Sequence, residues 1–144
     1  MIEEYINDNK DRFLEELYGL LRIPSISTES VHKPDMYRAA GYWKELLLNA
    51  GADKAEVFET AGNPVTWGEK IIDPSKPTVL VYGHMDVMPA EPLDQWKSPP
   101  FEPEIRDGRI WARGANDDKG QSMMHVKAFE LWSAQGRYPV MSGS

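Results

Sequence analysis

Apolar residues in the first 50 positions recur at the spacing of two amphipathic helices. The first pattern stops before Pro24, because the residue ahead of a proline disfavours helix. Its apolar positions are Ile2, Ile6, Phe13, Leu17, Leu20 and Leu21. In the second, Asp35 is placed to cap the start and Gly51 to supply a left-handed end. Its stripe consists of Met36, Ala39, Ala40, Trp43, Leu46, Leu47 and Ala50.

Three stretches with strand character follow the helices. Residues 55–60 and 64–72 predict two strands around an Ala-Gly-Asn turn. Residues 79–82 (Val-Leu-Val-Tyr) form a continuous apolar run between Pro77 and Gly83, which is typical of a strand buried on both faces. The order helix, helix, strand, strand, strand predicts an α/β fold in which a mixed sheet is covered by helices.

The rest of the chain alternates between irregular and regular patterns. Prolines at 89, 92, 99, 100 and 103 predict a stiff loop, attached to the body by Trp96 and Phe101. Residues 104–111 predict a hairpin with an Asp-Gly turn. From residue 120 to about 135 the pattern is helical and apolar almost all round, which predicts a deeply packed helix ended by Gly136. Residues 138–140 suggest the entry to another strand.

Composition narrows the classes of function. The net charge is 16 − 23 = −7 without a basic cluster, which argues against a nucleic-acid partner. No run of eighteen apolar residues is present, which argues against a membrane partner. The acidic N-terminus lacks a signal-peptide core, so a cytoplasmic location is the default expectation. With no cysteine, a metal site would use nitrogen and oxygen ligands only.

Two points in the chain carry side chains suited to a metal site. His84 and Asp86 follow the predicted strand and, being two residues apart, project from the same face. A metal-binding imidazole usually donates its second N–H to a carboxylate, and Asp86 is placed for that role. Asp117 stands at the start of the last helix, where backbone N–H groups and the helix dipole favour negative charge. Its two oxygens could bind two ions at once.

Plainer interpretations remain open for each of these residues. His84 could be a hydrogen-bonded core histidine, Asp86 a turn residue and Asp117 only a helix cap. Asp118 and Lys119 could be the solvated start of the helix. The other two histidines are most simply explained without a metal, His32 as a solvated loop residue and His125 as a buried or half-buried helix residue.

Two separated segments resemble the M20 family of dinuclear zinc metallopeptidases, which includes dipeptidases, carboxypeptidases and aminoacylases. Residues 83–89 (Gly-His-Met-Asp-Val-Met-Pro) resemble its His-x-Asp-Val-x-Pro segment, and residues 112–121 (Ala-Arg-Gly-Ala-Asn-Asp-Asp-Lys-Gly-Gln) resemble its second motif. Residues 96–103 and 107–111 match the linker between them. The Asp-Asp-Lys-Gly-Gln sequence is most similar to the dipeptidase branch that includes carnosine-type dipeptidases.

The resemblance implies specific roles. His84 would ligate one metal, Asp117 would bridge two, and Asp86 would support the His84 ring and tune the metal-bound water. A cis peptide bond would join Asp117 to Asp118. The implied cofactor is Zn²⁺, two ions per complete site, with Co²⁺ or Mn²⁺ as alternatives.

The family's other site residues have no match here. They are a Glu-Glu pair that includes the general base, a further carboxylate and a second histidine, and no Glu-Glu follows Glu16. We therefore expect residues 1–140 to be the N-terminal part of a metallopeptidase catalytic domain. Residues 141–144 would be a cloning remnant or a truncation point, and the chain alone would be inactive.

The implied activity is hydrolysis of a dipeptide, or of a similar peptide bond, by a water that two metals activate. A deacylase of N-acyl amino acids is one alternative. A non-catalytic fragment that binds metal or a partner is another. For the complete protein, a homodimer is an open option.

Overall fold

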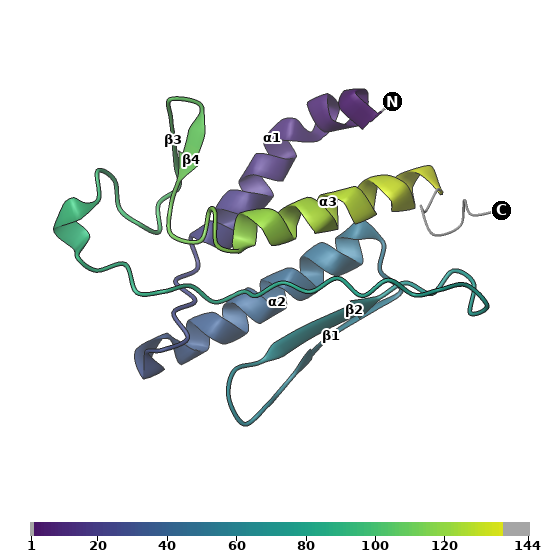
Figure 1. The fold of residues 1–144 in the computed structure, drawn as a ribbon, viewed down its shortest axis with the longest axis horizontal. Coiled ribbons are helices and arrows are strands. Elements are labelled where there is room, and N and C mark those ends of the chain that lie inside the picture. The colour runs from purple at the N-terminus through teal and green to yellow at the C-terminus, as the bar shows by residue number, and fades with distance from the viewer. Residues whose placement is uncertain (1, 137–144) are drawn as a thin grey trace.

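The computed structural model describes residues 2–136. Within that range it contains α1 (Ile2–Leu21), α2 (Lys33–Ala50) and α3 (Lys119–Gln135), with short 3₁₀ helices η1 (Ser30–His32) and η2 (Leu93–Gln95) (Figure 1). Two antiparallel pairs of strands complete it: β1 (Lys54–Phe58) with β2 (Val65–Glu69), and β3 (Glu104–Arg106) with β4 (Arg109–Trp111). The predicted strand entry at residues 138–140 and the segment 141–144 lie outside the described residues.

The first two helices confirm the apolar pattern. α1 buries Leu20 and Leu21 at its end, whereas Ile2 and Ile6 at its start are exposed. α2 begins at Lys33, two residues ahead of the predicted cap, and Asp35 lies in its first turn. It ends as expected at Gly51, whose φ of 110° is a left-handed conformation that favours glycine.

α2 occupies the centre of the molecule. Figure 1 shows it between α3 and the β1–β2 hairpin, and it contacts both. Gly68 of the hairpin packs against Leu47, and the hydroxyl of Thr66 donates to the carbonyl of Ala40 at 2.9 Å. The core between the three helices consists of Leu20, Trp43, Leu46, Ala50, Met123 and Val126. These are the faces that the helical spacing selects for burial.

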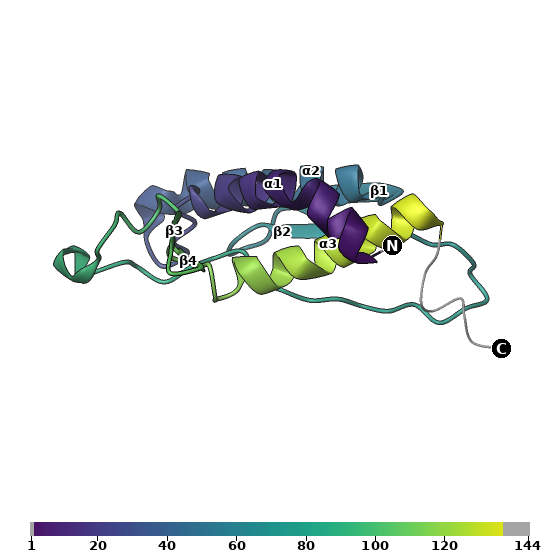
Figure 2. The same ribbon diagram turned by 90° about the horizontal axis from the view of Figure 1, so that it is seen from above.

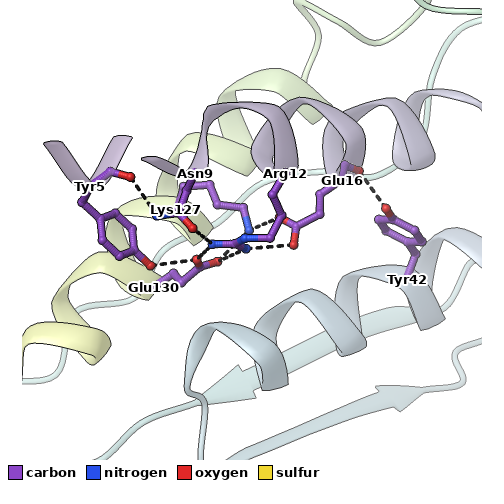
Figure 3. A network of polar contacts seen from close by, with 7 residues as sticks. All are labelled: Tyr5, Asn9, Arg12, Glu16, Tyr42, Lys127 and Glu130. Carbon is purple, nitrogen blue, oxygen red and sulfur yellow. Dashed lines mark hydrogen bonds and ion pairs between the residues drawn. The ribbon is translucent and has the colours of Figure 1, made fainter. Parts of the chain in front are cut away.

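α1 and α3 are joined by a charged network, drawn in Figure 3. Glu130 of α3 accepts hydrogen bonds from Tyr5 at 2.9 Å and Lys127 at 2.7 Å, and it pairs with Arg12 of α1. Lys127 in turn pairs with Glu16 of α1. Each buried charge therefore faces an opposite charge, which offsets the cost of removing it from water.

The predicted central strand is wrong for this structure. Residues 79–82 are extended but form no strand, and their side chains are between 57% and 85% exposed. In Figure 1 the segment passes across α2, and in Figure 2 it lies below α3. The sheets among residues 2–136 contain only β1 with β2 and β3 with β4, so this apolar run has no neighbouring strand to pair with. The α/β class is confirmed, but with small antiparallel sheets in place of one mixed sheet.

The hairpin and the loop before it agree with the pattern. Asp107 and Gly108 have φ values of 52° and 71°, as a two-residue turn with positive φ at both central positions requires. In the proline-rich loop, the indole N–H of Trp96 donates to the carbonyl of Ala90 at 2.8 Å. The guanidinium of Arg113 lies 5.3 Å from the centre of the Trp96 ring, so Trp96 does attach the loop to the body.

α3 departs from the expectation of burial all round. Its buried residues are Lys119, Met123, Val126, Glu130 and Leu131. Met124 and His125 are exposed, so the interpretation of His125 as buried or half-buried was wrong. The helix has one covered face, because α1 and α2 contact it while its other face meets solvent. No helix within residues 2–136 offers a stretch long and apolar enough to traverse a bilayer.

Candidate metal centre

The loop after α1 holds the end of the extended segment in place. The backbone N–H of Val87 donates to the carbonyl of Ser25 at 2.9 Å, and the Ser25 hydroxyl donates to the carbonyl of Met85 at 2.7 Å. A parallel bridge also pairs Ile26 with Val87. The Ser27 hydroxyl donates to Oδ2 of Asp86 at 2.5 Å. The backbone around His84 is thereby fixed even though residues 79–82 are exposed.

The structure brings His84, Asp86 and Asp117 together. Nδ1 of His84 lies 3.1 Å from both the carbonyl oxygen and Oδ1 of Asp86. Nε2 of the same ring lies 3.0 Å from Oδ1 of Asp117, which is 33 residues away in the sequence. One imidazole is therefore placed between two carboxylates that come from different parts of the chain.

The contact between His84 and Asp117 needs a proton or a metal ion between its two atoms. Asp86 offers only acceptors to Nδ1, so Nδ1 carries the ring N–H and the lone pair of neutral Nε2 faces Asp117. A lone pair and a carboxylate oxygen at 3.0 Å repel each other unless a proton or a metal ion lies between them. Burial alone lowers the pKa of His84, but the Asp86 carbonyl, Asp117 and the charges of Asp86 and Asp118 outweigh it and raise that pKa above its ordinary value.

Asp117 is well placed to receive further groups. Its side chain is 81% exposed, whereas those of His84 and Asp86 are about half as accessible. It directly precedes Asp118, the N-cap residue of α3, and the Asp117–Asp118 peptide bond is cis, as the resemblance implied.

Asp118 links the two halves of the site. Its Oδ2 accepts the backbone N–H of His84 at 3.2 Å and the hydroxyl of Ser122 at 2.8 Å. Gly83 makes this approach feasible, since a Cβ there would lie 2.1 Å from the Ser122 oxygen. The interpretation of Asp118 as the solvated start of a helix was therefore wrong.

Lys119 is buried, with no exposed side-chain surface. Its ammonium group donates to the carbonyls of Leu20 at 3.0 Å and Ile23 at 2.8 Å. Burial lowers the pKa of Lys119 to about 8, and the charges of Asp35 and Asp86 offset part of that effect. The alternative interpretation of Lys119 as a solvated residue is also excluded, because its ammonium group is buried against these two carbonyls.

The other two histidines have different surroundings. Nδ1 of His32 is 2.8 Å from Oδ2 of Asp35, and His125 is exposed on α3. Among residues 2–136, no point gathers three or more side chains able to ligate one ion. The donor atoms of His84 and Asp117 and their short separation thus suit a metal ion, but these two residues would be only part of its set of ligands.

Sequence reasoning missed the residues that hold this site together. They are Ser25, Ser27, Asp118, Lys119 and Ser122. Three of them are serines, two in a polar loop and Ser122 in the first turn of α3, where a hydroxyl can have many partners. A signal was present only for Asp118 and Lys119, which lie within a matched motif.

Comparison with known proteins identifies the relatives of this chain. The model of peptidase family M20/M25/M40 matches residues 80–141, which include His84, Asp86 and Asp117. A Cys-Gly metallodipeptidase of Schizosaccharomyces pombe is 34% identical over 143 residues, covering 92% of this chain and 30% of that protein. A succinyl-diaminopimelate desuccinylase of an Azoarcus species is 46% identical over 70 residues, 49% of this chain and 18% of that protein.

A solved structure gives the same assignment. The crystal structure of human carnosine dipeptidase 1 superposes with a TM-score of 0.81 at 27% identity, over 94% of this chain and 31% of that one. The chain spans about 30% of the length of the full-length dipeptidases that it matches. The matched family segment, the relatives and the shared fold together show that the chain belongs to the M20/M25/M40 family of peptidases.

Proposed function

We propose that His84 and Asp117 are ligands of a divalent-metal site and that the protein hydrolyses the peptide bond of a dipeptide. The observation that carries this proposal is the 3.0 Å approach of His84 Nε2 to Asp117 Oδ1, with Asp86 on the other ring nitrogen. A carboxylate behind a histidine is the usual way to fix the tautomer of a metal ligand. In this proposal Asp86 would orient His84, and Asp117 would contribute its carboxylate to the metal site.

The role of each residue follows from its placement. Asp86 keeps the proton on Nδ1, so that Nε2 presents its lone pair toward Asp117. Ser27 holds Asp86, and Asp118 holds the His84 backbone, so neither ligand needs to reorganise. Divalent ions, when bound at such a site, supply Lewis-acid polarisation of a carbonyl and activation of water near neutral pH.

Zn²⁺ is the ion we propose, two per complete site, because an imidazole and a carboxylate suit it; Co²⁺ and Mn²⁺ suit the same donors. The residues described provide two of the ligands. The remaining ligands and the general base would come from the part of the family's length that this chain does not span. We accordingly propose that the 144 residues alone have no peptidase activity.

The relatives guide the choice of substrate. Proteins named for Cys-Gly and for carnosine cleavage match more than nine-tenths of the chain, which supports a dipeptide as the substrate. Removal of an N-acyl group is the second candidate, favoured by the 46% identity to a desuccinylase over 70 residues. A homodimeric complete protein and a cytoplasmic location stay predictions.

The test uses the protein at the full length that its gene encodes. It is assayed with Cys-Gly, with β-Ala-His and with an N-succinyl amino acid, before and after metal removal by 1,10-phenanthroline and re-addition of Zn²⁺, Co²⁺ or Mn²⁺. We expect dipeptide turnover that is lost with the metal and restored by one of these ions. Turnover of the N-succinyl amino acid alone would favour the second candidate, and dipeptide turnover that persists without metal would contradict the site.

A further inference from the structure

Lys119 contributes a pair of directed contacts between α3 and the end of α1. It lies two residues after Asp117, and its ammonium group donates to the carbonyls of Leu20 and Ile23 at 3.0 Å and 2.8 Å. The Leu20 carbonyl lies in the last turn of α1, where the negative end of the helix dipole suits a cation, and the Ile23 carbonyl lies in the turn that follows. The alkyl part of the side chain packs beside Gly114, where a Cβ would lie 3.2 Å from Lys119 Cδ.

The partner segment of Lys119 continues directly into the contacts that hold His84. Two residues after Ile23, Ser25 binds the backbone of Met85 and Val87, at 2.7 Å and 2.9 Å. Further along, Ser27 binds Asp86 at 2.5 Å, and Asp86 lies against the His84 ring. One short stretch, residues 23–27, therefore contacts Lys119 at one end and the neighbours of His84 at the other.

Burying an ammonium group is costly for stability alone. An apolar side chain of similar volume would fill the same space without desolvating a charge, and such replacements are often neutral or stabilising. Unlike an apolar side chain, the ammonium group makes two directional hydrogen bonds. These fix the distance between the start of α3 and residues 20–23.

We propose that Lys119 is a positioning residue that sets the distance between Asp117 and His84 by tying the start of α3 to the loop that supports His84. The inference rests on the proposed metal site. It concerns metal affinity and coordination, since Lys119 itself is buried away from solvent and from any substrate.

Glu130 supplies a matched control. It is also buried, also lies on α3 and also joins that helix to α1, through Arg12 and Tyr5. It is 11 residues further along, which is about 16 Å at the rise of an α-helix. A general loss of α1–α3 packing would therefore be shared by Glu130→Gln and Lys119→Met, whereas loss of ligand positioning would be confined to Lys119→Met.

The experiment measures metal binding in the full-length protein and its Lys119→Met, Glu130→Gln and Asp117→Asn variants. Zn²⁺ affinity is obtained by competition with a chromophoric chelator, the visible spectrum of bound Co²⁺ reports coordination, and urea unfolding without metal reports stability. We expect Lys119→Met to bind Zn²⁺ about 10- to 100-fold more weakly, the range for residues that orient metal ligands, with an altered Co²⁺ spectrum. Glu130→Gln should keep wild-type affinity even where urea unfolding shows a loss of stability.

Wild-type affinity and spectrum in Lys119→Met would overturn the positioning role, as would equal weakening in Lys119→Met and Glu130→Gln. In either case, loss of binding in Asp117→Asn would leave the metal site itself standing. Wild-type protein without metal affinity, or Asp117→Asn with full affinity, would reject the site and the inference with it. If Lys119→Met does not fold, Lys119→Leu, which also lacks an N–H donor at this position, is judged by the same criteria.

Discussion

His84 and Asp118 are 34 residues apart in sequence, yet the backbone N–H of His84 donates a hydrogen bond to Oδ2 of Asp118 at 3.2 Å. The same oxygen accepts the hydroxyl of Ser122 at 2.8 Å. One carboxylate thus joins the extended segment to the first turn of α3. Asp118 directly follows the proposed ligand Asp117, and this contact fixes the backbone of the other proposed ligand, His84.

Replacing Asp118 should destabilise the fold, because Asp118→Ala leaves the partly buried N–H of His84 without its acceptor. An unsatisfied donor costs about 1–3 kcal/mol, so we expect the free energy of unfolding to fall by that amount. Ser122→Ala, which removes one donor and leaves Asp118 bound to His84, should cost about 0.5–1.5 kcal/mol. Urea unfolding of the metal-free, full-length protein measures both, and equal losses would argue against a special role for the Asp118–His84 contact.

Asp117→Ala should abolish metal binding by the full-length protein, since it removes the carboxylate proposed to bridge both ions. The metal content after dialysis, measured by mass spectrometry of the elements, should fall to background. Asp94→Ala is the control, because Asp94 is another exposed aspartate, in η2. Normal metal content in Asp117→Ala would show that Asp117 is not a ligand.

Asp86→Ala should separate ligand orientation from ligand binding. We expect the variant to keep much of its metal while its rate per bound metal falls about 10- to 100-fold, because His84 loses the carboxylate at Nδ1. Ser27→Ala, which removes only the hydrogen bond to Asp86 Oδ2, should have a smaller effect. If Asp86→Ala lost its metal as completely as Asp117→Ala, Asp86 would be a ligand in its own right.

Glu130 should make stability depend on pH in the acid range. Burial alone raises the pKa of Glu130, but hydrogen bonds from Arg12, Lys127 and Tyr5 outweigh it and lower that pKa from 4.5 to about 2. A carboxylate whose pKa is lowered by folding adds stability above pH 4.5, and this contribution is lost as the pH falls toward about 2.

Urea unfolding between pH 2 and pH 7 tests this dependence. Glu130→Gln should lose stability mainly above pH 4.5 and flatten the acid limb of the curve. Glu59→Gln, at an exposed position after β1, serves as the control and should follow the wild type. An unchanged acid limb in Glu130→Gln would show that Arg12 and Lys127 do not stabilise the charged form.

The helices and hairpins of this chain could be predicted from sequence because their signals are local. Spacing of apolar residues located α1 and α2, Gly51 ended α2, and Asp107 with Gly108 gave the turn of the β3–β4 hairpin. Residues 79–82 were misassigned because a β-strand requires an adjacent strand to hydrogen-bond with. Their apolar composition indicates a preference for burial, but it does not show whether such a strand is available.

The site was predictable in part. The contact between His84 and Asp117 was expected only from the match to two family motifs. The separation of 33 residues does not by itself predict that the two side chains lie close together. The supports were not predictable, because Lys119 is recognisable as a buried cation only once the carbonyls of Leu20 and Ile23 are in place.

The bare apolar stretch at residues 79–82 has a practical consequence for handling this chain. Its Val-Leu-Val-Tyr sequence carries no charge, and an uncovered extended backbone is a template on which another copy can align. Purified samples of the 144 residues should therefore scatter light increasingly as they are concentrated, despite a net charge of −7. Val81→Lys should suppress that turbidity, because the lysines of neighbouring copies would repel one another when their segments align.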